Sequence, residues 1–315
     1  MNKQHILGAV TLGLCILAVF LSHQEGAQKL GAFDQWKKDF GVTYNQDENI
    51  FRRLIFEENV AKIIKHNADN TQTYEMGINQ FTGLTEAEFV ANYLGSWAPE
   101  GIEKIEVQEV SMRDTNDVDW TTKGGVSQIK NQGQCGSCWA FSATGVVESY
   151  ALVKLGKSVN LSEQQLVDCT RNMGNYGCNG GWPYNALKYI QTKGIATEEE
   201  YPYTARDGTC KKDGGDFKIN GYSQAKSCGD MINSLNTEPL SVTVDASRWS
   251  SYRAGVFTNC GTSINHAVLL VGATQDYYKV KNSWGTSWGE NGYIRIGNPG
   301  QNTCGICTYG GYMPN

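Results

Sequence analysis

The stretch CGSCW, residues 135–139, is the most informative part of this chain. His266 follows the second cysteine of the stretch, Cys138, by 128 residues, and Asn282 follows it by 144 residues. A cysteine in this local context, with a histidine and an asparagine roughly 130–150 residues downstream, is typical of a catalytic thiol. The four histidines are at positions 5, 23, 66 and 266, and only the last follows Cys138. His266 is therefore the candidate base.

The composition describes a globular, loop-rich protein. Of the 315 residues, 40% are hydrophobic and 19% are charged, and 36 are glycine. This length allows about two domains. The chain has no basic run of the kind that nucleic-acid-binding proteins carry. We therefore expect no nucleic-acid partner, and no motif indicates a cofactor or a metal.

An apolar run covers residues 6–21, after Lys3. The run is short for a membrane span and predicts a secretory signal peptide over residues 1–22, with a retained signal anchor as the alternative. Export would place the nine cysteines beyond the run in a compartment where disulfides persist. Because nine is an odd number, one thiol is left over, and Cys138 is the candidate to stay free.

Two parts of the chain differ in charge. Residues 22–114 hold nine Lys and Arg against sixteen Asp and Glu, a net charge of −7, whereas residues 115–315 hold seventeen against sixteen, a net charge of +1. An acidic segment on a nearly neutral body would lose ion pairs as its carboxylates become protonated, so we expect acid to loosen it. Apolar periodicity predicts a helix over residues 47–68 within this segment.

The acidic segment also carries a recognisable pattern. It has the spacing E-x3-R-x2-I/V-F-x2-N-x3-I-x3-N, at Glu48, Arg52, Ile55, Phe56, Asn59, Ile63 and Asn67. Residues 77–81 add the pattern G-x-N-x-F. The family pattern continues with an aspartate two residues later, and Gly83 replaces it here. With these features residues 23–114 resemble the inhibitory propeptides of the cathepsin L-like branch of papain-like cysteine proteases. The resemblance implies an inhibitory segment. The run after Leu94 through Arg113 contains Pro99 and Gly101 and has no long apolar pattern, which predicts a tether that is cut.

Residues 115–315 resemble the mature domain of the same family. Beyond CGSCW, the markers are residues 161–164 (LSEQ), 177–181 (GCNGG), 265–268 (NHAV) and 281–285 (KNSWG). The resemblance implies an α+β, papain-like two-lobed fold, with a helical first lobe, a β-rich second lobe and a substrate cleft between them. A helix is expected from Cys138 to Leu155, with Gly156 ending it.

The resemblance implies specific catalytic roles. Cys138 would be the nucleophile, His266 its base, and Asn282 the residue that orients the imidazole, while Trp284 would shield that contact from water. The side chain of Gln132 and the backbone N–H of Cys138 would bind the oxyanion. A helix N-terminus and a nearby imidazolium both favour thiolate, so we expect Cys138 to ionise readily.

Disulfide pairs also follow from the resemblance. They are Cys135 with Cys178, Cys169 with Cys210, and Cys260 with Cys304. Cys228 and Cys307 are additional to this common pattern, and either a fourth bridge or two buried thiols would account for them.

The substrate site is implied in the same way. The backbone of Gly180 and Gly181 would pair with an extended substrate, and the pocket for the second residue before the cut would be lined by Trp182, Pro183, Thr243, Ile264 and Tyr309. This mostly apolar set predicts a preference for Leu, Val or Phe, and Tyr309 would make the pocket shallow and disfavour Arg.

The predicted protein is a secretory or lysosomal-type cysteine endopeptidase made as an inactive proenzyme. Peptides and proteins would be its substrates, its own propeptide and cystatin-like proteins its inhibitors, and a monomer its working form. It would reside in a lysosome-like vacuole or outside the cell. Asn160, Leu161 and Ser162 form a glycosylation sequon.

Two other functions remain open from the sequence. One is a catalytically silent binding protein on the papain fold. The other is a thiol-disulfide oxidoreductase that uses the C-x-x-C pair of Cys135 and Cys138 or that of Cys304 and Cys307.

Overall fold

The computed structural model describes residues 31–105, 107 and 117–315. The predicted signal peptide and the predicted boundary between residues 114 and 115 lie outside these residues. None of the described helices combines the length and apolar character that crossing a membrane requires.

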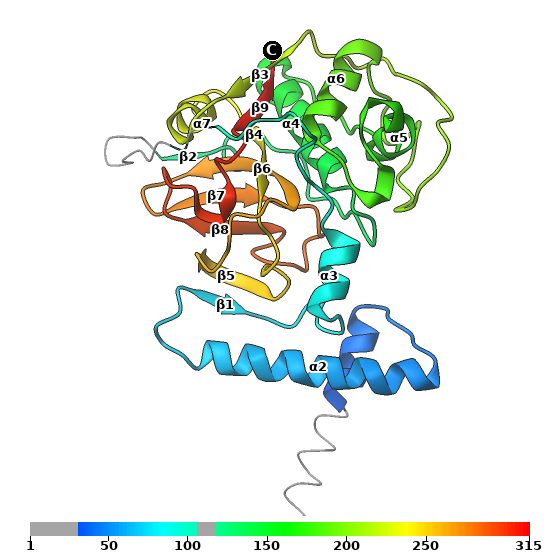
Figure 1. Cartoon of the computed structure of the whole chain (residues 1–315), viewed down its shortest axis with the longest axis vertical. Helices are drawn as coiled ribbons and strands as arrows, with labels where there is room; N and C mark the ends of the chain where they lie inside the picture. Colours follow the sequence, from blue (N-terminus) through cyan, green and yellow to red (C-terminus); the bar gives the residue numbers. More distant parts are fainter. Residues whose placement is uncertain (1–30, 106, 108–116) are drawn as a thin grey trace, which may run out of the picture.

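Helix α2 and the short helix before it lie at one end of the molecule, below the rest of the chain in Figure 1. A short helix over residues 31–39 is followed by α2 (Gln46–Asn67), strand β1 (Tyr74–Met76) and helix α3 (Glu86–Tyr93). Helix α2 is the one predicted over residues 47–68, and it begins where the Asn45 side chain accepts a hydrogen bond from the Glu48 N–H. Phe33, Trp36 and Phe56 form its small core.

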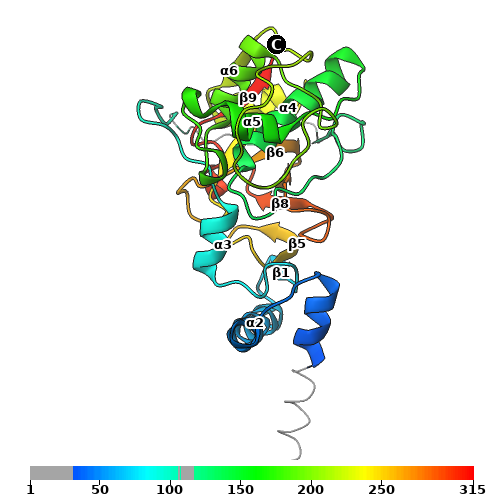
Figure 2. The ribbon, with the colours of Figure 1, turned by 90° about the vertical axis from the view of Figure 1, so that its right-hand side faces the viewer.

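Polar residues of the propeptide pattern join α2 to the chain around α3. Asn59 Nδ2 donates to the carbonyls of Thr82 and Leu84, at 2.9 Å each. Arg52 lies 2.7 Å from the carboxylate of Glu88, which belongs to α3. The pattern thus fixes α3, the element that leads into the rest of the protein (Figure 2).

Gly83, the departure from the family pattern, has a steric explanation. A Cβ atom at this position would lie 2.4 Å from the ring of Trp36. Trp36 is itself fixed, because its Nε1–H donates to the Asn79 carbonyl at 2.8 Å. In this chain an aromatic ring therefore fills the space that a side chain at position 83 would need.

The expectation that acid breaks ion pairs between prosegment and body needs correction. Among the described residues one such pair exists, between Glu75 and Arg253, with a nitrogen–oxygen distance of 4.0 Å and both side chains well exposed. A pair of this kind contributes little. The Arg52–Glu88 pair, which lies within the prosegment, is better placed to respond to acid.

We predict that acid destabilises the prosegment through Glu88. Its hydrogen bond with Arg52 is the main reason that its pKa falls from 4.5 to about 2. The stabilisation is therefore complete above about pH 4.5 and lost as the pH falls towards about 2. Thermal unfolding of a Cys138→Ala proenzyme should show this loss, and Glu88→Gln should reduce it. Glu58→Gln, which removes an exposed pair with Lys62, should leave the loss intact.

The first lobe consists of helices around a common core. These are α4 (Cys138–Leu155), α5 (Glu163–Cys169) and α6 (Pro183–Lys193). Helix α4 has the predicted bounds, and Gly156 ends it in the left-handed region, with φ of 63°. Thirteen of its eighteen residues are buried, because α4 lies between the sheet and the other two helices (Figure 1).

The second lobe is built on a sheet that the prosegment extends. The strand order is β1-β5-β8-β7-β6-β4-β9-β3, with β2 also paired to β6. Its strands and the helix α7 are β2 (Val118–Asp119), β3 (Tyr222–Ala225), α7 (Cys228–Leu235), β4 (Leu240–Val244), β5 (Tyr252–Phe257), β6 (His266–Ala273), β7 (Tyr277–Lys281), β8 (Tyr293–Gly297) and β9 (Gly311–Pro314). Strand β1 pairs antiparallel with β5, so the prosegment supplies an edge strand.

Four disulfides cross-link the body. They join Cys135 to Cys178, Cys169 to Cys210, Cys228 to Cys307 and Cys260 to Cys304. The question left open for Cys228 and Cys307 is answered by a fourth bridge. Cys138 is the free cysteine of the described residues.

Candidate active site

The two lobes bring Cys138 and His266 to one place. Cys138 is the first residue of α4, and His266 is the first residue of β6, against which α4 packs. Both side chains are fully buried. Ser137, which precedes Cys138, makes no capping hydrogen bond through its side chain, so the partial positive charge of the helix N-terminus is directed at the thiol.

Asn282 holds the imidazole of His266. His266 Nε2 lies 2.8 Å from Asn282 Oδ1, which also accepts from the N–H of Ser283 at 2.8 Å. Because an amide oxygen only accepts, Nε2 must carry the proton and Nδ1 is the free ring nitrogen. That Nδ1 is buried and has no partner among the described residues. The arrangement leaves Nδ1 available as a base.

Trp284 covers this hydrogen bond on one side. Its ring centroid lies 4.7 Å from that of His266. On its other faces, Phe81 and Phe89 of the prosegment pack edge-on at 5.4 and 5.2 Å. Trp284 thus lies against the imidazole, in the place where the predicted shielding role would require it.

Gln132 is held rigidly with its amide group facing the prosegment. Its Oε1 accepts from Ser283 Oγ at 2.7 Å and from Trp284 Nε1 at 3.1 Å. These contacts orient Nε2, which donates to the carbonyls of Tyr93 at 3.0 Å and Cys135 at 2.8 Å. A carbonyl of the prosegment therefore binds the donor that would bind an oxyanion.

The prosegment crosses the cleft immediately after α3. The N–H of Gly181 donates to the Gly95 carbonyl at 2.9 Å, and the N–H of Ser96 donates to the Asn265 carbonyl at 3.0 Å. A Cβ atom on Gly95 would lie 2.2 Å from the carbonyl oxygen of Gly136. The approach is possible only because Gly95 has no side chain.

This path corrects the interpretation of residues after Leu94 as a mere tether. Residues 94–96 are buried in the cleft, and Trp97 stacks on Tyr176 with ring centroids 6.2 Å apart. The signal in the sequence that could have indicated this contact is Gly95, a residue without a side chain, two positions before Trp97. Tyr176, exposed beside the cleft, is a binding candidate that the sequence reasoning missed.

Burial changes the ionisation of both reacting groups. Desolvation raises the pKa of the Cys138 thiol to about 11 and lowers the pKa of His266 to about 4. In the proenzyme, burial therefore opposes the ready ionisation expected from the helix N-terminus. The neutral thiol is a poor nucleophile.

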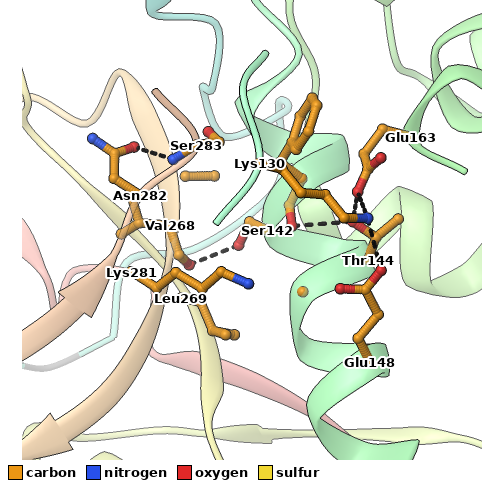
Figure 3. Close-up of a pocket in the computed structure, with 13 residues that line it drawn as sticks. Lys130, Ser142, Thr144, Glu148, Glu163, Val268, Leu269, Lys281, Asn282 and Ser283 are labelled. Atoms are coloured by element: carbon orange, nitrogen blue, oxygen red, sulfur yellow. Dashed lines mark hydrogen bonds and ion pairs between the residues drawn. The ribbon is translucent and has the colours of Figure 1, made fainter. Parts of the chain in front are cut away.

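A buried charged cluster lies behind the site, between the lobes (Figure 3). Lys130 Nζ contacts Glu148 at 2.7 Å and Glu163 at 2.6 Å. Lys281, which precedes Asn282, donates instead to Ser127, through its carbonyl and its hydroxyl, at 2.9 Å each. Burial raises the pKa of the Glu163 carboxyl above its usual range, and it lowers the pKa of Lys281 to about 8. Ser127 in turn donates to Glu148 of α4. The cluster therefore connects α4, through Ser127, to Lys281 at the end of β7, the residue before Asn282.

The predicted pocket residues lie around one apolar cluster. Trp182 and Tyr309 meet edge to face, with ring centroids 5.2 Å apart. Pro183 begins α6, Thr243 is buried in β4, and Ile264 packs against the same core as Trp182. Ala98 and Ile102 of the prosegment are partly buried against the same core cluster.

The disulfides disfavour the oxidoreductase interpretation. Neither C-x-x-C sequence forms a local bond, because Cys135, Cys304 and Cys307 are each joined to a distant cysteine. Cys138 is left without a disulfide partner and is fully buried. A redox dithiol would need both sulfurs of one pair to be free together.

Comparison with known proteins agrees with this site. Residues 115–313 match the papain family of cysteine proteases, and residues 33–89 match the cathepsin propeptide inhibitor domain. A cathepsin L-like proteinase of Fasciola hepatica is 42% identical over 294 residues, covering 87% of this chain and 90% of that protein. The structure of a recombinant stem bromelain precursor is similar with a TM-score of 0.81 and 37% identity, over 91% of this chain and 99% of that one.

A mature relative has also been solved with an inhibitor. The bromelain protease of Ananas comosus in complex with E64 shares 40% identity, with a TM-score of 0.58, over 63% of this chain and 98% of that one. The chain therefore belongs to the papain family of cysteine proteases. It is a cysteine protease that carries a cathepsin-type inhibitory propeptide, a zymogen, and neither alternative function has support.

Proposed function

We propose that Cys138 attacks the scissile carbonyl as a thiolate, after the prosegment has left the cleft. His266 Nδ1 takes the thiol proton, later donates it to the leaving amine, and then activates the water that hydrolyses the acyl-enzyme. Asn282 keeps Nε2 protonated, and hence Nδ1 free for this cycle. The 2.8 Å contact between His266 Nε2 and Asn282 Oδ1 is the observation that carries the proposal.

The oxyanion is bound by Gln132 Nε2 and the backbone N–H of Cys138. The support is that Gln132 already donates to a carbonyl, that of Tyr93, and is held from behind by Ser283 and Trp284. Preorganised donors of this kind stabilise the transition state because they need no reorientation during the reaction.

Gln132→Ala should therefore lower kcat about a hundredfold or more, with a smaller effect on KM. Steady-state kinetics on the processed enzyme, normalised by active-site titration, would measure it. The control is Gln134→Ala, two residues along the same loop and exposed, which should retain nearly full activity. Equal kcat values in the two variants would show that Gln132 does not bind the oxyanion.

The substrate is an extended peptide bound along Gly180 and Gly181. Support comes from the prosegment, whose Gly95 carbonyl is bound by the N–H of Gly181. The pocket of Trp182, Pro183, Thr243, Ile264 and Tyr309 would select Leu, Val or Phe at the second residue before the cut. A peptide library cleaved best with Arg at that position would contradict this.

We further propose that residues 23–114 are removed by cleavage close to residue 115, after a signal peptide covering residues 1–22 has been lost. The mature endopeptidase would act as a monomer in a lysosome-like vacuole or outside the cell, and cystatin-like proteins would inhibit it. N-terminal sequencing of the processed protein, with fractionation of the producing cells, tests these points.

A further inference from the structure

The fourth disulfide is attached to the wall of the proposed substrate pocket. Cys307 lies two residues before Tyr309, and both Cys307 and Cys228 are fully buried. Cys228 is the first residue of α7, which follows β3 after two residues. The bond therefore ties the segment before Tyr309 to the junction between β3 and α7.

A second contact from the same junction holds Tyr309 itself. Gln224, in β3, donates through Nε2 to the Tyr309 carbonyl at 2.9 Å. Beyond Tyr309 the chain enters β9, which pairs antiparallel with β3 and places Gln224 opposite Tyr312. Residues 307–312 are thus fixed at their start by a covalent bond, in the middle by a hydrogen bond and at their end by sheet pairing.

The Tyr309 ring depends on this anchoring. The ring packs edge-on against Trp182, which comes from the first lobe and is fully buried. Between η3 (Thr303–Gly305) and β9 the chain forms turns, in which the Thr308 N–H donates to the Gly305 carbonyl at 2.9 Å and the Gly310 N–H to the Cys307 carbonyl at 3.1 Å. These bonds and the Gln224 contact are neutral hydrogen bonds, each weak on its own, whereas the disulfide is the covalent restraint on residues 306–310.

We propose that the Cys228–Cys307 disulfide is a specificity-determining cross-link, which holds Tyr309 against Trp182 and so limits the depth of the pocket for the second residue before the cut. This inference rests on the proposed function. A purely stabilising disulfide would change the unfolding temperature but not the choice between substrates. Substrate selectivity therefore distinguishes the two roles.

The experiment measures kcat/KM for two peptides that differ only in carrying Val or Phe at the selected position. For the processed Cys228→Ser/Cys307→Ser enzyme, the ratio of kcat/KM for the Phe peptide to kcat/KM for the Val peptide should be about tenfold above that of the wild type. A deeper pocket makes more contacts with the larger side chain and so favours the Phe peptide. The control is Cys169→Ser/Cys210→Ser, which loses a disulfide of the first lobe and should keep the wild-type ratio within about twofold.

A double-mutant cycle tests the route through Tyr309. Tyr309→Ala alone should raise the Phe to Val ratio, and removing the disulfide in that background should add nothing, since the two changes act through one ring. Additive effects would overturn the proposal. So would an unchanged ratio in the folded disulfide variant.

Gln224→Ala covers the case in which the disulfide variant does not fold. This variant retains all four disulfides and loses the hydrogen bond to the Tyr309 carbonyl. Its Phe to Val ratio should therefore also rise. An unchanged ratio would then refute the inference. A wild-type enzyme that cleaves neither peptide and does not react with E-64 would refute the proposed function instead, which keeps the two failures distinct.

Discussion

Replacing Cys138 with serine should abolish peptide hydrolysis, with kcat falling by roughly four orders of magnitude or more, as for the loss of other catalytic nucleophiles. Serine has nearly the same shape, but its hydroxyl is far less acidic than a thiol and His266 is not arranged to ionise it. The variant should also fail to process its own prosegment at acid pH. Peptidase assays and the mass of the purified chain would measure both effects.

The control for this prediction lies on the same helix. Ser149 is buried in α4, and its hydroxyl has no hydrogen-bond partner among the described residues. Ser149→Ala should therefore retain activity. Substantial hydrolysis by the Cys138→Ser enzyme, with its fold shown intact by circular dichroism, would mean that another residue is the nucleophile.

Gly95→Val should displace the prosegment from the cleft in a larger fraction of the uncleaved proenzyme. The added side chain would collide with the Gly136 carbonyl, since even a Cβ atom would lie 2.2 Å from that oxygen. Overpacking of this kind costs about 1–3 kcal/mol, which corresponds to an increase of roughly ten- to a hundredfold in the open fraction. The rate at which E-64 modifies Cys138 in the uncleaved protein at neutral pH would report this fraction.

A second glycine of the prosegment provides the comparison. Among the described residues, no atom lies within 4 Å of the place where a Cβ on Gly31 would be. E-64 should therefore modify the Gly31→Val proenzyme at the wild-type rate. If the two valine variants reacted equally slowly, the contact of Gly95 with Gly136 would not be what closes the cleft.

Local patterns in the sequence were sufficient for the elements with strong signals. Helix α4 has the predicted bounds, Cys138–Leu155, and α2 (Gln46–Asn67) lies within one residue of the predicted range 47–68. The structure also places His266 Nε2 beside Asn282 Oδ1, a pairing that the resemblance implied. Each of these features depends on residue type and spacing, which a sequence displays directly.

Features that depend on contacts between distant segments were not predictable in this way. Strand β1 has three residues, and its pairing with β5 is defined only in the folded molecule. The path of residues 94–96 depends on Gly136, and the absence of a side chain at position 83 depends on Trp36. The raised pKa of Cys138 follows from burial, which opposes the effect expected from the helix N-terminus alone.

The most direct test of this account is to incubate the proenzyme at about pH 4 to 5, treat it with E-64, and locate the adduct by mass spectrometry alongside a peptidase assay. The account predicts one adduct, on Cys138, together with loss of peptidase activity and a new N-terminus close to residue 115. A folded and processed protein that carries no adduct on Cys138 and cleaves no peptide would contradict it.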